Sequence, residues 1–294
     1  MQEFLSLRAF SGNQDDLVAF LESNFPRQTR VLNPRLAARI PESKSVEIRV
    51  PLNSHAFQEI NGFIESKRNQ NIDGYKYVTT TVMRKYSESD LQSAEILLLT
   101  IRSHFEPSGE ECGTIYETLC NECNWGRQVS DLILDLRRVP QHKDISETIA
   151  WVEWVVSSKF VRTFAENKLT GAEFRPIFEF KNPTKQSKEW HQLRVTGKAG
   201  ELAETTKLGR DPFSPSQVSW RCPLGHAVAT QFLSEIYLHR NAWDGSDIAI
   251  TGALFGQGRN LLRPAPLIII SQRMYRVLQE AGLKGFSYEI AHLV

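Results

Sequence analysis

The feature that most constrains how this chain folds is a segment that occurs twice. Residues 155–174 align without a gap to residues 269–288, at a constant offset of 114 residues, as from Ser157 to Ser271. The identical pairs are Ser157/Ser271, Arg162/Arg276, Glu166/Glu280, Leu169/Leu283 and Gly171/Gly285. An internal repeat of this kind marks a structural unit that is used more than once. We therefore expect two similar units in the C-terminal two-thirds of the chain.

Each copy has the pattern of a strand, a helix and a second strand. An apolar run ends at a serine, a favoured N-cap for the helix that follows. Residues four positions apart then form an apolar helical stripe, Phe160 with Phe164 in one copy and Met274 with Leu278 in the other. A glycine permits the turn into the second strand. A weaker parallel upstream extends the expected repeat over much of 120–180 and 222–294.

The first ninety residues alternate between strand and helix patterns. We expect strands over 3–10, 45–52 and 75–84 and helices over 14–23 and 55–68. The predicted fold class is α/β, with α+β as the alternative. The predicted organisation is a small α/β domain over 1–90, a first repeat-containing domain over 91–180, a connector rich in lysine, proline, glycine and serine over 181–221, and a second repeat copy over 222–294.

Composition limits the partners and the location of the protein. The 294 residues are enough to bury a core without disulfides, and the net charge of +1 argues against coating nucleic acid or anionic membranes by bulk charge. The first ten residues lack the pattern of a secretory signal, and apolar runs such as 96–101 and 267–270 are far shorter than the roughly 20 residues of a membrane span. We expect a soluble cytoplasmic protein with no membrane partner.

Cysteines supply the strongest candidate site. Cys120 and Cys123 form a Cys-x2-Cys pair, and Cys222 and His226 form a Cys-x3-His pair. Together the two pairs have the ligand types of a tetrahedral zinc site that is closed and structural. The half-sites meet if the repeat copies pair about a pseudo-twofold axis, and Cys112 is an alternate ligand for His226. The competing interpretation is that these are small buried residues and an ordinary polar histidine.

An acidic stretch is the candidate partner-binding region. Residues 103–125 contain no lysine or arginine and carry five glutamates, Glu106, Glu110, Glu111, Glu117 and Glu122. Such a stretch can speed the capture of a basic partner. The alternative is a solvated loop.

Three further patterns suggest other functions. Basic residues surround Trp190 and His191, an arrangement that suits single-stranded nucleic acid but is disfavoured by the near-zero net charge; they are Lys181, Lys185, Lys188, Arg194 and Lys198. Gly252, Gly256 and Gly258 lack the Lys-Ser/Thr of a phosphate-binding loop and predict a flexible loop. No nucleophile, base and orienting group stand at a recognisable spacing, but an enzyme site in a cleft between the repeat copies stays an alternative, with candidate residues His226, His239, Asp244 and Asp247.

The repeated pattern and the cysteine pairs together resemble bacterial immunity proteins of polymorphic toxin systems, closest to the double CxxCG motif family. The resemblance covers roughly 110–180 and 222–294 and implies a non-enzymatic cytosolic antidote that binds a cognate protein toxin. This sequence departs from the motif at two places. Asn124 follows Cys123 where the motif has glycine, with Gly126 two positions further on, and His226 replaces a cysteine.

Overall fold

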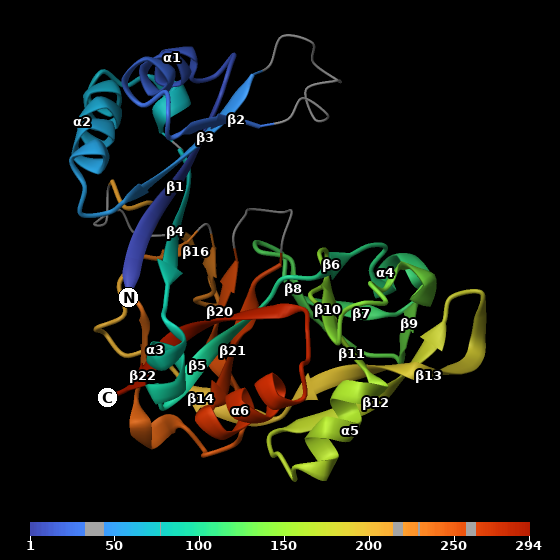
Figure 1. Cartoon of the computed structure of the whole chain (residues 1–294). Coiled ribbons are helices and arrows are strands. Elements are labelled where there is room, and N and C mark those ends of the chain that lie inside the picture. The colour runs from blue at the N-terminus through green and yellow to red at the C-terminus, as the bar shows by residue number, and fades with distance from the viewer. Residues whose placement is uncertain (33–43, 77, 214–219, 229, 257–262) are drawn as a thin grey trace. The chain divides into compact units, whose positions relative to one another are not determined.

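The computed structural model describes residues 1–32, 44–76, 78–213, 220–228, 230–256 and 263–294 (Figure 1). Helices and strands are mixed, with 43% strand and 23% helix, which confirms the predicted class and leans toward α+β. The chain divides into two compact units. The first contains Met1–Ser87, Leu208–Val218 and Gln231–Leu233; the second contains Glu88–Lys207, Ser219–Thr230 and Ser234–Val294. Nowhere in the described ranges is a helix long and apolar enough to cross a bilayer.

The first unit is a sheet covered by two helices. Its elements are β1 (Gln2–Phe10), α1 (Asp15–Asn24), β2 (Thr29–Val31), β3 (Ser45–Pro51), α2 (His55–Asn69), η2 (Asp73–Tyr75), β4 (Thr79–Lys85), β15 (Leu208–Gly209) and β18 (Gln231–Phe232). β1 to β4 pair antiparallel in the order β2-β3-β1-β4. Alternate residues such as Leu5, Leu7 and Ile48 are fully buried beneath Leu17 of α1 and Ile60 of α2. The expected strand over 75–84 begins only at Thr79 because residues 73–75 form a short 3-10 turn.

The second unit contains two larger sheets. The first sheet and its connections use β6 (His104–Phe105), α4 (Gly109–Cys112), β7 (Tyr116–Cys120), β8 (Trp125–Gln128), β9 (Leu132–Leu134), η3 (Leu136–Arg138), β10 (Ile145–Thr148), β11 (Trp154–Ser157), α5 (Ser158–Glu166), β12 (Ala172–Glu179) and β13 (Asn182–Val195). Its strand order is β6-β10-β11-β13-β12-β9, and β7 and β8 form a separate hairpin.

The second sheet of this unit uses α3 (Glu88–Ser93), β5 (Ile96–Ile101), β14 (Gly197–Gly200), β16 (Trp220–Arg221), β17 (Ala227–Val228), β19 (Ile236–Leu238), η4 (Arg240–Ala242), β20 (Ile248–Gly256), β21 (Ala265–Ser271), α6 (Gln272–Glu280) and β22 (Phe286–Leu293). The strand order is β16-β17-β20-β21-β5-β22-β19, with β14 paired to β20.

The two strand–helix–strand segments occupy matching places in the two sheets. In the first sheet β13 lies between β11 and β12, antiparallel to both, and in the second sheet β5 lies in the same way between β21 and β22. The central strand β13 follows β12 directly in the sequence, whereas β5 precedes the whole first sheet in the sequence and yet completes the second sheet. Apolar side chains of both helices, Phe160 and Met274 among them, share one buried core with Leu99 of β5 and Leu193 of β13.

The helix starts are formed as the sequence predicts. The Ser157 hydroxyl accepts a hydrogen bond from the backbone N–H of Phe160, and the Ser271 hydroxyl accepts one from Met274. These bonds satisfy donors that the first helical turn leaves free. The copies therefore share local capping as well as strand order. Their origin by duplication stays a prediction.

The expected connector over 181–221 is corrected by the structure. Residues 182–195 form β13, the longest strand described. The lysine-rich first part is mostly exposed, which explains its polar composition, while Trp190 and Leu193 are buried in the sheet. Because β5 (residues 96–101) pairs with β21 and β22 in the second sheet, residues 91–180 and 222–294 belong to one compact unit rather than to two separate domains.

Candidate metal centre

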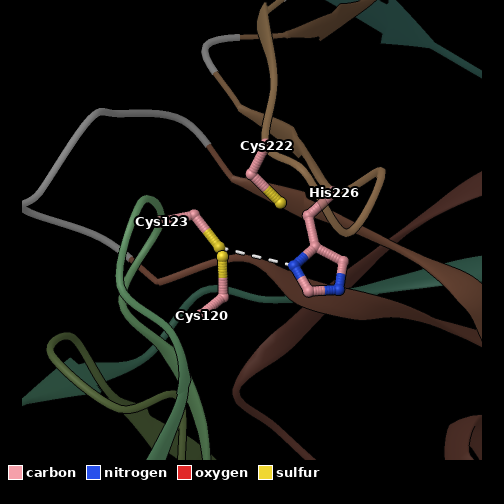
Figure 2. Close-up of side chains that lie close together, drawn as sticks. All are labelled: Cys120, Cys123, Cys222 and His226. Carbon is pink, nitrogen blue, oxygen red and sulfur yellow. Dashed lines mark hydrogen bonds between the residues drawn. The ribbon is translucent and has the colours of Figure 1, made fainter.

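Four side chains from two hairpins converge within the second unit. Cys120 ends β7 and Cys123 precedes β8, while Cys222 and His226 flank the turn between β16 and β17. Figure 2 shows the three thiols and the imidazole pointing toward one another. The ligand atoms all lie within 4.8 Å of each other, and the Cys123 sulfur is 3.4 Å from Nδ1 of His226. A tetrahedral zinc site, with Zn–S near 2.3 Å, places neighbouring ligand atoms about 3.8 Å apart. The cluster therefore has the size and the ligands to hold a metal ion.

The two turns are shaped by their backbones. Asn124 has a φ of +55°, in the left-handed region that glycine adopts freely and asparagine tolerates better than most residues. Asn124, at the position where the double CxxCG motif has glycine, therefore adopts a glycine-like conformation. In the second turn, the N–H of Cys222 donates to the carbonyl of His226 at 3.1 Å, and the N–H of Gly225 donates to Cys222 at 2.8 Å. These bonds close the loop that brings Cys222 and His226 together.

Burial and local hydrogen bonds set the protonation of the ligands. Burial opposes ionisation of Cys120, but N–H groups of Cys123 and Glu122 and neighbouring thiols outweigh it and hold its pKa below the usual range. Burial raises the pKa of Cys123 to about 12. Burial also lowers the pKa of His226, which favours the neutral imidazole that binds metals. A bound cation would ionise the thiols by direct coordination.

Surrounding groups close the site to solvent. All three cysteine ligands are buried, and the ring of Trp125 meets the His226 ring edge-on at 4.9 Å. Nε of Arg263 donates to the carbonyl of Asn124 at 2.9 Å and fixes the first turn from outside. Neither Trp125 nor Arg263 is among the site residues predicted from the sequence. Trp125 follows Cys123 by two positions, which is the one local signal of its role; Arg263 is far away in sequence and gives none.

Cys112, the alternate ligand, lies elsewhere. It is buried at the end of α4, and it is not a member of the four-residue cluster. Burial raises the pKa of its thiol. The four cysteines are all free thiols in the structure.

The acidic residues predicted to bind a partner have different local roles. Glu106 accepts the N–H groups of Ile149 and Ala150, both at 2.9 Å. Glu110 accepts from the Trp151 indole at 2.6 Å, and Glu111 completes a capping box with Ser108. Glu117 pairs with Arg127 at 2.7 Å, and Glu122 is exposed in the turn between the two cysteines. Partner binding by these five carboxylates stays a prediction.

The other patterns from the sequence are not brought together into a site. Trp190 is only 4% exposed, so its indole is not available to stack on a base. The candidate enzyme residues also have separate partners. Asp247 is hydrogen-bonded to Thr170, Ser271 and Arg273. Asp244 accepts from the backbone N–H groups of Lys198 and Ser246, and His239 lies 3.7 Å from Glu204. Gly252 and Gly256 belong to β20, and Gly258 lies outside the described residues.

The geometry thus places the four residues of the predicted zinc site together and leaves the remaining candidates in separate structural roles. No protein-family model matches this chain, and a comparison with curated proteins finds no significant relative.

Proposed function

We propose that this chain is a zinc-clasped binding protein that neutralises a protein toxin by occupying its surface. The observation that carries the proposal is an exposed apolar face on the β7–β8 hairpin, the same hairpin that supplies two of the metal ligands. The antidote role itself follows from the resemblance to immunity proteins and awaits the test below.

The hairpin separates its residues between two faces. Side chains alternate along a strand, and in β7 Cys120 turns toward the metal cluster while Leu119 remains exposed at 39%. Ile115, directly before β7, is 61% exposed. Val129, 54% exposed, lies beside Ile115, to which its N–H is hydrogen-bonded at 2.9 Å. Exposed apolar groups gathered on one face are typical of a protein-binding surface.

The charges around this face define the complementary partner. Glu117 is about half exposed between the apolar residues, and Glu122 is exposed at the hairpin tip. Glu106 and Glu111 are committed to backbone contacts. Glu117 is itself ion-paired with Arg127 at 2.7 Å, so we place the charged partner contact at Glu122 and at the edge of this pair rather than along the whole acidic stretch. A basic toxin surface with an apolar centre fits this arrangement.

Zinc is the metal that the ligand set favours. Three thiols and one imidazole at tetrahedral spacing suit Zn²⁺, and four protein ligands leave no open position for substrate or water. Such a site stabilises structure. Here it would hold the β7–β8 hairpin against the 220–228 hairpin and so keep the binding face rigid, which lowers the entropic cost of association.

The test is co-expression with the protein encoded by the adjacent gene, followed by affinity purification and a growth assay. We expect a stable complex that protects cells. Ile115→Asp should weaken the complex at least tenfold, about 1.4 kcal/mol, because it places a charge at the centre of an apolar contact. Phe180→Asp is the matched control, since Phe180 is also exposed, at 44%, and belongs to a different hairpin. Equal affinity of both variants would remove the hairpin face from the proposal, and no complex with the wild type would remove the antidote role.

A further inference from the structure

Beside the metal centre, the second unit contains a pocket of about 320 Å³. It lies among β8, the turn between β10 and β11, the end of β13 and the start of β21, and its lining includes Tyr116, Trp125, Trp151, Trp154, Arg194 and Arg263. This volume is at the lower end of the range for small-ligand sites. It suits a molecule of one or two rings.

One wall of the pocket is a fixed aromatic stack. The rings of Tyr116 and Trp151 lie 3.8 Å apart at 21°, and the Arg263 guanidinium lies 3.5 Å from the centre of the Trp151 ring. Arg263 is held by hydrogen bonds to the carbonyls of Asn124 and Ala150, each at 2.9 Å. Since Tyr116 and Arg263 cover the two faces of the Trp151 ring, a planar ligand would meet this indole edge-on, a favourable aromatic geometry. The wall is rigid before any ligand arrives.

The charge of the lining favours an anion. Arginines 127, 194 and 263 all border the pocket. Arg127 is paired with Glu117 and Arg263 lies 3.7 Å from Glu110, whereas no salt bridge to Arg194 is found in the described part of the chain. Desolvation lowers the pKa of both Arg263, which is partly buried, and Arg194, whose side chain is exposed at the pocket. A bound anion would form a charge-assisted hydrogen bond with Arg194.

The acidic residue of the lining is occupied. Glu153 accepts hydrogen bonds from the N–H of Gly109 at 2.9 Å and from the hydroxyls of Tyr116 and Thr148. These donors offset its charge and leave the arginines dominant.

The backbone at the pocket is strained. Val152, which lines the pocket, has a φ of +58°, a conformation that is a genuine outlier for a β-branched side chain. Such strain costs on the order of 1–3 kcal/mol and is found where surrounding contacts impose it, often at ligand sites. Here the preceding turn is imposed by Glu106, which accepts two backbone N–H groups, and by Arg263, which donates to Ala150. Together these contacts present Trp151 to the pocket.

We propose that this pocket binds a small planar aromatic anion, with its ring against the indole-lined wall and its charge at Arg194. The proposal does not depend on toxin binding. It adds a small-molecule site next to the metal-held hairpin, to which the pocket is joined through Trp125 and the hydrogen bond from Arg263 to Asn124.

The experiment uses the full chain loaded with zinc and three probes: naphthalene-2-sulfonate, neutral 2-naphthol and inorganic phosphate. Binding is followed by tryptophan fluorescence, since three tryptophans line the pocket, and by calorimetry. We expect one-to-one saturable binding of the sulfonate, at least tenfold weaker binding of 2-naphthol and none of phosphate. Arg194→Gln should weaken sulfonate binding about tenfold, with partial recovery in Arg194→Lys. Arg162→Gln, at an exposed arginine of α5 outside the lining, is the control and should bind as the wild type does.

Two results would overturn the proposal. Equal binding of the sulfonate and the neutral naphthol by the wild type would show that charge plays no part, and this comparison needs no variant. Unchanged affinity in folded Arg194→Gln, or no saturable binding of the sulfonate, would remove the assigned site.

Discussion

The carboxylate of Asp144 accepts a hydrogen bond at 2.9 Å from the backbone N–H of Lys284, which lies 140 residues further along the chain. A corresponding bond joins the first segment to the aspartate of the second, because the backbone N–H of Thr170 donates to the carboxylate of Asp247 at 2.9 Å. Each aspartate also accepts from the capping serine of its own segment, Asp144 from Ser157 and Asp247 from Ser271. The two segments are therefore tied to each other by matching contacts at the ends of their helices.

Removing these aspartates should destabilise the second unit to different degrees. Asp247 is 5% exposed and also accepts from Arg273, so Asp247→Ala leaves several buried donors unpaired and should cost about 3–5 kcal/mol. Asp144 is less buried, and Asp144→Ala should cost about 1–2 kcal/mol. Urea unfolding of both variants checks the order. Equal losses, or a larger loss at Asp144, would contradict the role given to burial.

Two glycines permit the close approach of the segments. Gly171 has a φ of +95°, and a Cβ there would lie 2.0 Å from the carbonyl oxygen of Ile248. Gly285 has a φ of +121°, and a Cβ there would lie 2.2 Å from the carbonyl oxygen of Ile145. Alanine at either position must displace backbone and should cost more than about 3 kcal/mol, beyond the roughly 1 kcal/mol of a left-handed non-glycine residue.

Gly282 provides the control for this prediction. Its φ is +59°, and no atom lies within 4 Å of a Cβ built there, so Gly282→Ala should cost only about 1 kcal/mol. The measurement is the unfolding midpoint of the three variants. Similar midpoints would mean that conformation alone, rather than the neighbouring carbonyl, requires glycine.

The helix caps could be predicted because their causes are local. A serine before an apolar helical stripe specifies its own capping bond, and both Ser157 and Ser271 make it. The metal cluster could be predicted because its ligand types and short spacings are distinctive. The place of β5 in the second sheet could not be predicted, since no local pattern tells a strand which sheet it will complete. The burial of Trp190 could not be predicted for the same reason. The lysines around it are typical of a linker, whereas the burial of its indole depends on pairing with a strand that is distant in sequence.

The zinc content of cysteine variants should distinguish the ligand cysteines of the cluster from Cys112. Cys123→Ser deletes one ligand and should abolish stoichiometric zinc and lower the melting temperature by roughly 4 °C or more, equivalent to about 2 kcal/mol or more. Cys112→Ser replaces an equally buried thiol outside the cluster, so it should keep the zinc. Elemental analysis of purified protein and thermal melts with and without chelator test this. Zinc retained in Cys123→Ser, or lost in Cys112→Ser, would contradict the ligand assignment.

Glu153 should make the stability of the second unit depend on pH. Burial raises the pKa of its carboxyl to about 7, from 4.5 when exposed, although Tyr116 and the N–H of Gly109 oppose the shift. Below pH 4.5 both the folded and the unfolded chain hold the proton, and the stabilisation is complete. As the pH rises toward 7 the unfolded chain releases its proton first, so the stabilisation is lost, by about 3 kcal/mol in total. Burial also raises the pKa of Glu147 to about 7, and its contribution has the same sign.

Glu153→Gln isolates this contribution, because glutamine keeps the shape of the protonated acid and cannot ionise. The variant should match the wild type near pH 4.5 and become the more stable protein, by up to about 3 kcal/mol, near pH 8. Glu173→Gln, at an exposed position on β12, should leave the difference from wild type constant. Urea unfolding at both pH values gives the comparison. A stability difference between Glu153→Gln and wild type that does not change with pH would contradict this prediction. It would show that the Glu153 carboxyl has the same pKa in the folded and unfolded chain, because its three hydrogen-bond donors offset the effect of burial.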